Sequence, residues 1–246
     1  MGNGPLPELP PSLAELLGLL AIVSESFNLD EAVMFAENPE PRCPCVLLLD
    51  RSGSMAGPPM AALNEGLRTF QADLNRDDLA RKRVEIAIVT FDDRAEILQD
   101  FVTADAFEAP TLEPGGMTYM GAAIHAALDA IEARKRQYRA NGVAYYRPWV
   151  FLITDGAPSD EPGTVEKAAR RIRAAEDAKS LAFFAVGVED ADMGKLREIA
   201  VRDPLKLRGL QFRELFLWLS ASMQRVSQSR TDEQVPLPSP TGWGEV

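Results

Sequence analysis

Short, mostly apolar runs alternate along the chain with longer segments in which apolar residues recur at every third or fourth position. The apolar runs lie at residues 45–49, 84–91, 149–154 and 181–188. Runs of this length are typical of strands buried on both faces, whereas the wider spacing is typical of helices with one apolar face. The spaced segments lie at residues 60–74, 120–139, 166–179, 192–200 and 212–226. This alternation predicts a three-layer α/β domain, in which helices cover both faces of a mostly parallel sheet.

One strand is expected to run against the others. Asp92, Asp93 and Arg94 form a predicted tight turn after the second apolar run, and residues 95–101 then return as an antiparallel edge strand. The predicted fold class is therefore a Rossmann-like α/β domain whose central sheet is mostly parallel, with one antiparallel edge strand.

Residues 1–42 precede the predicted domain and form an expected extension with short helices. Ser12 begins the first of these helices as its N-cap, and Glu15 stands three residues later, as a capping box requires. A second short helix is expected at residues 29–35. The extension is too small to fold alone, so it must pack on the domain or on a partner.

Residues 43–227 form the predicted domain, and residues 228–246 follow it as a polar segment that becomes rich in proline. This composition predicts a flexible tail. An exposed Trp243 is unusual in such a tail, and it could instead dock onto a neighbour.

Composition and charge narrow the class of protein. The 246 residues are 46% hydrophobic and 26% charged, as in an ordinary globular protein, and the formal net charge is −11. This acidic balance argues against nucleic acid as a partner, and the basic residues Arg134, Lys135 and Arg136 are expected to complement a helix dipole instead. No apolar run approaches the roughly 20 residues of a membrane span, so we expect no membrane association.

The only two cysteines, Cys43 and Cys45, stand one residue apart. A disulfide between such close neighbours would be strained, and a single histidine cannot complete a zinc site around them. We therefore expect two reduced thiols beside a buried strand, which suits a cytoplasmic protein.

Oxygen-bearing side chains follow the first apolar run. Asp50, Ser52 and Ser54 stand there at alternate positions. Two later segments have a similar character: Gly115-Gly116-Met117-Thr118 precedes a predicted helix, and Thr154-Asp155-Gly156 ends a predicted strand. In an open α/β sheet such loops lie at one edge, beyond the carboxyl ends of the strands, where ligands bind. The three segments are therefore expected to meet.

The order and spacing of these segments resemble a known family. The pattern D-x-S-x-S, then a threonine after glycines, then a strand-ending T-D-G, is similar to the von Willebrand factor A domain and its metal-ion-dependent adhesion site. The resemblance covers roughly residues 43–227. Within that family the chain most resembles bacterial stand-alone TerY-like proteins, which are associated with stress, tellurium-resistance-type and phosphorylation-linked systems.

The resemblance implies a metal site formed by five residues. They are Asp50, Ser52, Ser54, Thr118 and Asp155. Hydroxyl and carboxylate oxygens suit Mg²⁺, a hard cation that keeps some of its water, and Mn²⁺ or Ca²⁺ could take its place. In the family, the ion accepts a carboxylate from an Asp or Glu of another protein. The implied function is a metal-dependent protein–protein interaction module and not an enzyme.

Other interpretations of the same residues stay open. The serines could form a turn and Thr118 a helix cap, which would need no metal. A serine hydrolase is disfavoured, because His125 lies seven residues beyond Thr118 on the same predicted helix and no G-x-S-x-G motif is present. A Mg²⁺-dependent phosphoryl-transfer enzyme using Asp50 is the main alternative, since such enzymes also place an aspartate at a strand end. A scaffold without a functional ion is the third.

Overall fold

The computed structural model describes residues 29–161, 163–231, 233, 235–240 and 242–245. The chain divides into two units, residues 1–39 and residues 40–246. The described part of the first unit contains helix α2 (Leu29–Glu37), which confirms the second of the two predicted short helices. The predicted helix beginning at Ser12 lies outside the described residues.

The second unit contains a seven-stranded sheet. Its strands are β1 (Cys43–Asp50), β2 (Val84–Phe91), β3 (Ala95–Thr103), β4 (Trp149–Thr154), β5 (Ala182–Gly187), β6 (Leu205–Leu207) and β7 (Gly244–Glu245). Their order in the sheet is β3-β2-β1-β4-β5-β6-β7. Pairing is parallel from β2 across to β6, and β3 and β7 run antiparallel at the two edges. The predicted fold class is confirmed, with a second antiparallel edge strand that was not expected.

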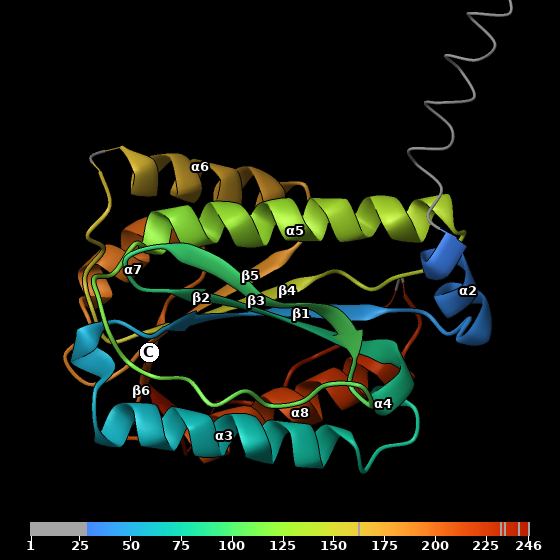
Figure 1. Cartoon of the computed structure of the whole chain (residues 1–246), viewed down its shortest axis with the longest axis horizontal. Helices are drawn as coiled ribbons and strands as arrows, with labels where there is room; N and C mark the ends of the chain where they lie inside the picture. Colours follow the sequence, from blue (N-terminus) through green and yellow to red (C-terminus); the bar gives the residue numbers. More distant parts are fainter. Residues whose placement is uncertain (1–28, 162, 232, 234, 241, 246) are drawn as a thin grey trace, which may run out of the picture. The chain divides into compact units, whose positions relative to one another are not determined.

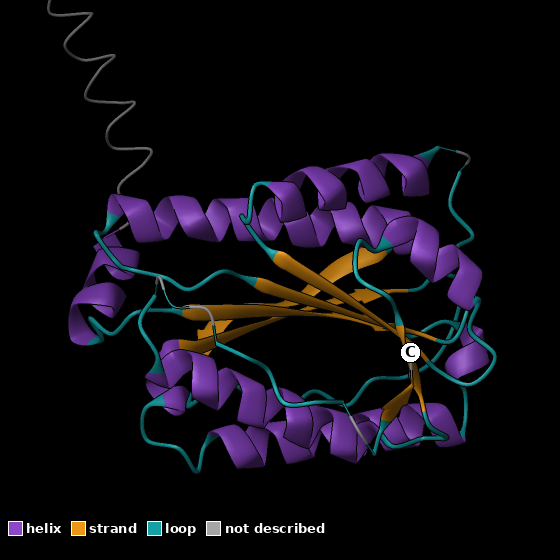
Figure 2. Ribbon diagram, turned by 180° about the vertical axis from the view of Figure 1, so that it is seen from behind, coloured by secondary structure: helices purple, strands orange, loops and turns teal. Residues whose placement is uncertain are grey.

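Helices cover both faces of this sheet, as Figure 1 and the reverse view in Figure 2 show. The helices of the second unit are η1 (Gly53–Met55), α3 (Pro58–Leu74), α4 (Ala80–Arg83), α5 (Met120–Ala140), α6 (Thr164–Asp177), α7 (Met193–Ile199) and α8 (Phe212–Gln228). Helices α5 and α6 lie on one face, and α3 and α8 lie on the other. Among the residues described, no helix combines the length and hydropathy needed to traverse a lipid bilayer.

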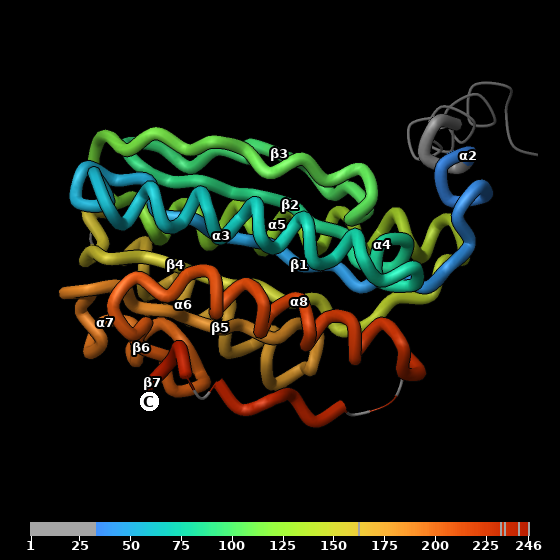
Figure 3. Tube along the Cα trace, turned by 90° about the horizontal axis from the view of Figure 1, so that it is seen from below, coloured from blue at the N-terminus to red at the C-terminus, as the bar shows by residue number. Residues whose placement is uncertain are grey.

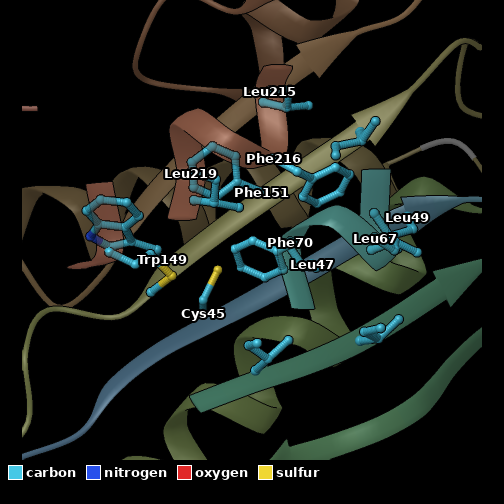
Figure 4. Close-up of a cluster of buried hydrophobic side chains, with 14 of the residues drawn as sticks. Cys45, Leu47, Leu49, Leu67, Phe70, Trp149, Phe151, Leu215, Phe216 and Leu219 are labelled. Atoms are coloured by element: carbon cyan, nitrogen blue, oxygen red, sulfur yellow. The ribbon is translucent and has the colours of Figure 1, made fainter. Parts of the chain in front are cut away.

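Strand β1 explains why the first apolar run is continuous. Successive side chains of a strand point to opposite faces, so Leu47 and Leu49 pack toward α3 and α8 while Val46 and Leu48 pack toward α5 and α6. Figure 4 shows the first of these two cores, in which Phe70 of α3 and Phe216 of α8 lie with ring centroids 5.5 Å apart. A strand covered on both faces has no position for a polar side chain until it ends at Asp50.

Cys43 and Cys45 are buried free thiols at the start of β1, as expected. Burial raises the pKa of Cys43 to about 12, and a neighbouring carboxylate, Glu85, adds to this shift. The thiols therefore stay protonated and act as small apolar groups in the core.

The order of the strands creates a crevice at the carboxyl end of β1. From β1 the chain continues to β2 and β3 on one side, and then crosses to β4 on the other side. The loops that leave β1 and β4 therefore diverge, and open α/β sheets bind their ligands at this switch point. The first and third of the predicted site segments lie there.

The carboxyl-terminal segment is not the flexible tail that its composition predicts. Trp243 is only 2% exposed and packs against Trp218 of α8 with ring centroids 5.3 Å apart, and strand β7 pairs with β6. Val235 and Leu237 also pack against the core formed by α3, α8 and the sheet. The prediction is wrong for the described residues because a few apolar side chains hold the segment on the domain. The overall composition of the segment does not reveal their contacts.

Glu85 forms a buried ion cluster at the amino-terminal end of β2. Its carboxylate accepts hydrogen bonds from Arg42 Nε at 2.9 Å, Arg134 Nε at 2.8 Å and Tyr138 Oη at 2.5 Å. All four side chains are buried. Burial, together with the charge of Glu85, raises the pKa of Tyr138 above its usual value. The expectation that Arg134 complements a helix dipole is wrong, because this guanidinium turns inward and fastens α5 to β2.

Removal of Glu85 is predicted to destabilise the domain strongly. Glu85→Ala leaves two buried guanidinium groups without their carboxylate, and breaking a buried pair in this way costs about 3–5 kcal/mol. Urea unfolding followed by circular dichroism measures the loss. The matched control is Glu65→Ala, which removes an exposed ion pair with Arg68 and should change the free energy of unfolding by less than about 1 kcal/mol. Equal effects of the two substitutions would contradict a structural role for the cluster.

Candidate metal centre

The candidate centre is assembled at the ends of two neighbouring parallel strands. β1 and β4 are in register up to Leu49 and Ile153, so Asp50 and Thr154 emerge side by side. The backbone N–H of Arg51 then donates to the carbonyl of Phe91 on β2, at 3.0 Å, which holds the start of the loop against the sheet. The loop turns immediately into η1 and presents its serines to the crevice.

A continuous chain of hydrogen bonds links the first and third predicted segments. Asp50 Oδ1 accepts from the backbone N–H of Ser52 at 2.7 Å, and Asp50 Oδ2 accepts from Thr154 Oγ1 at 2.5 Å. Ser52 Oγ lies 3.0 Å from Ser54 Oγ, and Ser54 Oγ donates to Asp155 Oδ1 at 2.7 Å. Four of the five predicted residues therefore belong to a single hydrogen-bond network, in which the backbone N–H of Ser52 links Asp50 to the two serines.

Thr118 joins this group from the loop that precedes α5. A Cβ atom added to Gly156 would lie 3.4 Å from Thr118 Oγ1 and 3.9 Å from Asp50 Oδ2. The three residues are therefore in close proximity, and the absence of a side chain at Gly156 keeps the space between the two oxygens open. The structure brings all five predicted residues together, and their role as metal ligands stays a prediction.

Helix capping does not occupy these hydroxyl groups. Helix α5 begins after Tyr119, and its first N–H groups are bound by Asp160, whose carboxylate accepts from Gly121 N at 2.8 Å and Ala122 N at 2.9 Å. Ser52 stands at the N-cap of η1 without a capping hydrogen bond from its side chain. The predicted turn is present, since Asp50 forms an Asx turn by accepting a hydrogen bond from the backbone N–H of Ser52. The predicted caps are not, because neither the Ser52 nor the Thr118 hydroxyl group caps a helix.

Thr154 is a functional candidate for which the sequence pattern predicted no role of its own. Its side chain is fully buried, donates to Asp50, and accepts from the backbone N–H of Gly156 at 3.2 Å. It therefore fixes the orientation of the Asp50 carboxylate. Its position directly before Asp155, at the end of a predicted strand, is the feature of the sequence from which this role could have been predicted.

Asp93 is a second functional candidate that was not predicted from the sequence, because a turn between two strands indicates only a connection. Its carboxylate accepts from the backbone N–H of Met117 at 2.8 Å, and the carbonyl of Asp92 accepts from Tyr119 N at 3.0 Å. Gly116 has φ +74°, and a Cβ atom there would approach the Asp93 carboxyl carbon to 2.8 Å. The turn between β2 and β3 therefore holds the loop that carries Thr118.

The carboxylates of the centre lack a cationic partner. Among the described residues, neither Asp50 nor Asp155 forms an ion pair with an arginine or lysine side chain. Arg51, the cation nearest in sequence, turns toward Asp92 at 2.9 Å and Glu96 at 3.0 Å. No cationic side chain of residues 29–161 or of the later described ranges therefore offsets the negative charge of the crevice.

Burial raises the pKa of Asp50 from 3.8 to about 6, although hydrogen bonds from Ser52 and Thr154 oppose the shift and the charge of Asp155 adds to it. Burial also raises the pKa of Asp155. Two carboxylates that resist ionisation in the same crevice would both be stabilised by a cation between them.

The donor set fits a hard divalent cation. The crevice offers three hydroxyl groups and two carboxylates, which suit an ion that prefers oxygen ligands and retains water. Within the described part of the chain, no cluster of three or more His, Cys, Asp or Glu residues forms another candidate for a metal site. The single histidine, His125, lies with Nδ1 2.8 Å from a guanidinium nitrogen of Arg171, so it belongs to the contact between α5 and α6.

Comparison with known proteins agrees with this architecture. The model of the von Willebrand factor type A domain matches residues 45–206, which is more than half of the chain. No curated protein matches the sequence at a significant level.

Several solved structures are similar in fold. A von Willebrand factor type A protein from Catenulispora acidiphila is 19% identical with a TM-score of 0.55, over 75% of this chain and 43% of that one. The open conformation of the pilus adhesin SpaC from Lactobacillus rhamnosus GG is 14% identical with a TM-score of 0.59, over 75% and 30%. A mutant of the PilB minor pilin from Streptococcus sanguinis is 11% identical with a TM-score of 0.57, over 76% and 63%. The match spans less than half of the Catenulispora protein, and identities this low show the fold alone.

Asp50 is predicted to destabilise the metal-free domain at neutral pH. Because its pKa in the folded state is raised above 3.8, the folded state holds the proton more tightly, and stability falls as the pH rises from about 4 to about 6. The shift corresponds to at most about 3 kcal/mol. Asp50→Asn cannot titrate, so its free energy of unfolding relative to wild type should rise by about 2 kcal/mol between pH 4.5 and pH 7.5, in urea titrations with EDTA.

The matched control is Asp78→Asn, which changes a carboxylate that is 92% exposed. Its free energy of unfolding should differ from that of wild type by less than about 1 kcal/mol at either pH, as expected for an exposed ion pair. A pH-independent difference for Asp50→Asn would show that its carboxylate is not a destabilising buried charge.

Proposed function

The chain belongs to the von Willebrand factor type A domain family, a family of metal-dependent adhesion and interaction modules, and we propose that it binds a partner protein through Mg²⁺ held in the crevice. The observation that carries the proposal is the convergence of five oxygen-bearing residues from three loops, with two carboxylates that pair with no cationic side chain in the part of the chain that the structure describes. Such a crevice lowers its electrostatic free energy by binding a divalent cation.

Each residue of the crevice has a distinct part in this proposal. Ser52, Ser54 and Thr118 would hold the ion through hydroxyl oxygens, and Asp50 and Asp155 would balance its charge. The bound ion would supply a Lewis-acidic position that accepts a carboxylate oxygen from an Asp or Glu of the partner. We favour Mg²⁺ over Mn²⁺ or Ca²⁺ because few protein ligands, mostly hydroxyls, leave room for the water that Mg²⁺ retains.

The setting of the crevice supports binding over catalysis. Both oxygens of Asp50 already accept hydrogen bonds and its side chain is fully buried, which is unfavourable for a nucleophile in phosphoryl transfer. We therefore propose that the protein is not an enzyme. The resemblance to TerY-like proteins extends the proposal to a bacterial, cytoplasmic module of a stress, tellurium-resistance-type or phosphorylation-linked system.

Removal of the Thr118 hydroxyl is predicted to weaken Mg²⁺ binding without unfolding the domain. Thr118→Val keeps the shape of the side chain and deletes the oxygen, and Thr118→Ser keeps the oxygen. Isothermal titration calorimetry should show Mg²⁺ binding weakened about tenfold or more by Thr118→Val, about 1.4 kcal/mol, and nearly unchanged by Thr118→Ser. Equal Mg²⁺ affinity of wild type and Thr118→Val would remove Thr118 from the ligand set.

Partner recognition is predicted to need both the ion and a carboxylate. Labelled wild-type protein should bind members of an acidic peptide array in Mg²⁺, and should lose them in EDTA or when the acidic residue is changed to its amide. Protein carrying Asp50→Ala should bind none of these peptides. The same preparations should not hydrolyse p-nitrophenyl phosphate or acetyl phosphate, and turnover that Asp50→Ala abolishes would favour the phosphoryl-transfer alternative.

A further inference from the structure

The segment after α8 lies on the domain as an extended peptide lies on a receptor. We call residues 235–240 and 242–245 the tail segment. Figure 3 shows it running back beside α8 and returning to the sheet as β7, next to β6. Residues 235–240 have no regular secondary structure, so side chains and single hydrogen bonds hold them in place.

The first part of the tail segment is held as proline-rich peptides are held by aromatic grooves. Val235 and Leu237 pack inward, while Pro236 between them is exposed. The indole N–H of Trp218 donates to the carbonyl of Pro238 at 2.9 Å. An extended proline-rich strand with an indole donor to its backbone is a general mode of peptide recognition, because the peptide loses little conformational entropy on binding.

The second part adds a strand and an aromatic anchor. Trp243 is buried against Trp218, its carbonyl accepts from the backbone N–H of Arg208 at 2.8 Å, and Gly244 pairs with Leu207 of β6. Glu245 forms an ion pair with Arg208 at 2.7 Å. Addition of a strand to a sheet edge, together with one buried aromatic side chain, is a second established mode of peptide binding.

The fit between the tail segment and its seat is incomplete. A pocket of about 250 Å³ remains between the chain after α8 and the sheet, and aromatic and basic side chains line it. Its lining includes Trp149, Phe184, Arg147, Arg202, Val235 and Leu237. The indole N–H of Trp243 is buried without a hydrogen-bond partner among the described residues, which costs about 1–3 kcal/mol. Apart from the buried Trp243, the segment is therefore held at a few points and leaves part of its seat unfilled.

We propose that this seat is a peptide-binding groove, and that its partner is the tail segment of a second copy of the chain. Every contact that the tail segment makes within one chain can be made between two copies, so an exchange of tail segments keeps these contacts. The chain has six residues between α8 and the tail segment, and six residues can span roughly 20 Å when extended, which gives the segment reach beyond its own groove. The tail of the same chain is favoured at low protein concentration because its effective concentration is on the order of millimolar.

The groove is tested first with a labelled peptide of residues 235–246 and full-length variants. Trp243→Ala weakens the tail of the same chain and leaves Trp218 in the groove. Leu237→Ser does so at a different point, in case the first variant folds poorly. Both variants should bind the peptide at least about tenfold more tightly than wild type, whose own tail competes. A peptide in which the tryptophan is alanine, and a chain carrying both Trp218→Phe and Trp243→Ala, should show no binding.

Exchange between copies is tested by mixing two full-length chains. Trp218→Phe keeps the tail and impairs the groove, whereas Trp243→Ala keeps the groove and impairs the tail. Sedimentation velocity should detect a mixed dimer, with each variant alone remaining monomeric. Absence of peptide binding to variants with native circular dichroism and thermal unfolding would overturn the groove, and peptide binding without any mixed dimer would overturn the second copy as the partner. Mg²⁺ binding by the same variants should be unchanged, which separates this test from that of the metal centre.

Discussion

The constraint on which the site depends is the placement of two carboxylates, Asp50 fully buried and Asp155 partly buried, in a crevice where none of the described arginine or lysine side chains neutralises them. Strand β1 is covered on both faces, so its first polar side chain, Asp50, appears only where the strand ends. The crossing from β1 to β4 brings Asp155 to the same edge. Burial opposes the ionisation of both groups, and the loops hold them together nonetheless through Thr154 and Ser54. The fold thus maintains an arrangement that is unfavourable for the folded protein alone and favourable once a cation is present.

Much of the fold could be predicted from the sequence, because it depends on regular patterns. The run at 149–154 is strand β4 to the residue, and the edge strand at 95–101 is β3 with two more residues. Short elements such as α4 and β6 were not predicted, since four and three residues give no periodicity to recognise. The tail was predicted wrongly, because proline content suggests a lack of regular structure and carries no information about what the intervening apolar residues contact.

The residues of the candidate site could be predicted from the sequence. The residues that hold its loops in place could not. The spacing of Asp50, Ser52 and Ser54 and the strand-ending Asp155 were visible because they follow apolar runs directly. Asp93 and Asp160 were not, because their targets are backbone N–H groups on the loop of Thr118 and at the start of α5. A contact of this kind joins positions 24 and 39 residues apart and leaves no pattern in a single sequence. The inward orientation of the Arg134 side chain toward Glu85 could not be predicted for the same reason.

The Glu85 cluster has a mechanical consequence for the distant crevice. Helix α5 starts two residues after Thr118, and its second half is fixed to β2 through Arg134 and Tyr138. Sliding the helix by one residue, about 1.5 Å, would disrupt bonds of 2.5–2.8 Å whose partners have no water to replace them. A displacement of Thr118 along the axis of α5 is therefore opposed by the hydrogen bonds at the other end of this helix. Thr118 is thus held from two sides, by the Glu85 cluster through α5 and by Asp93 through the loop, so an occupant of the crevice meets a hydroxyl group that is already in place.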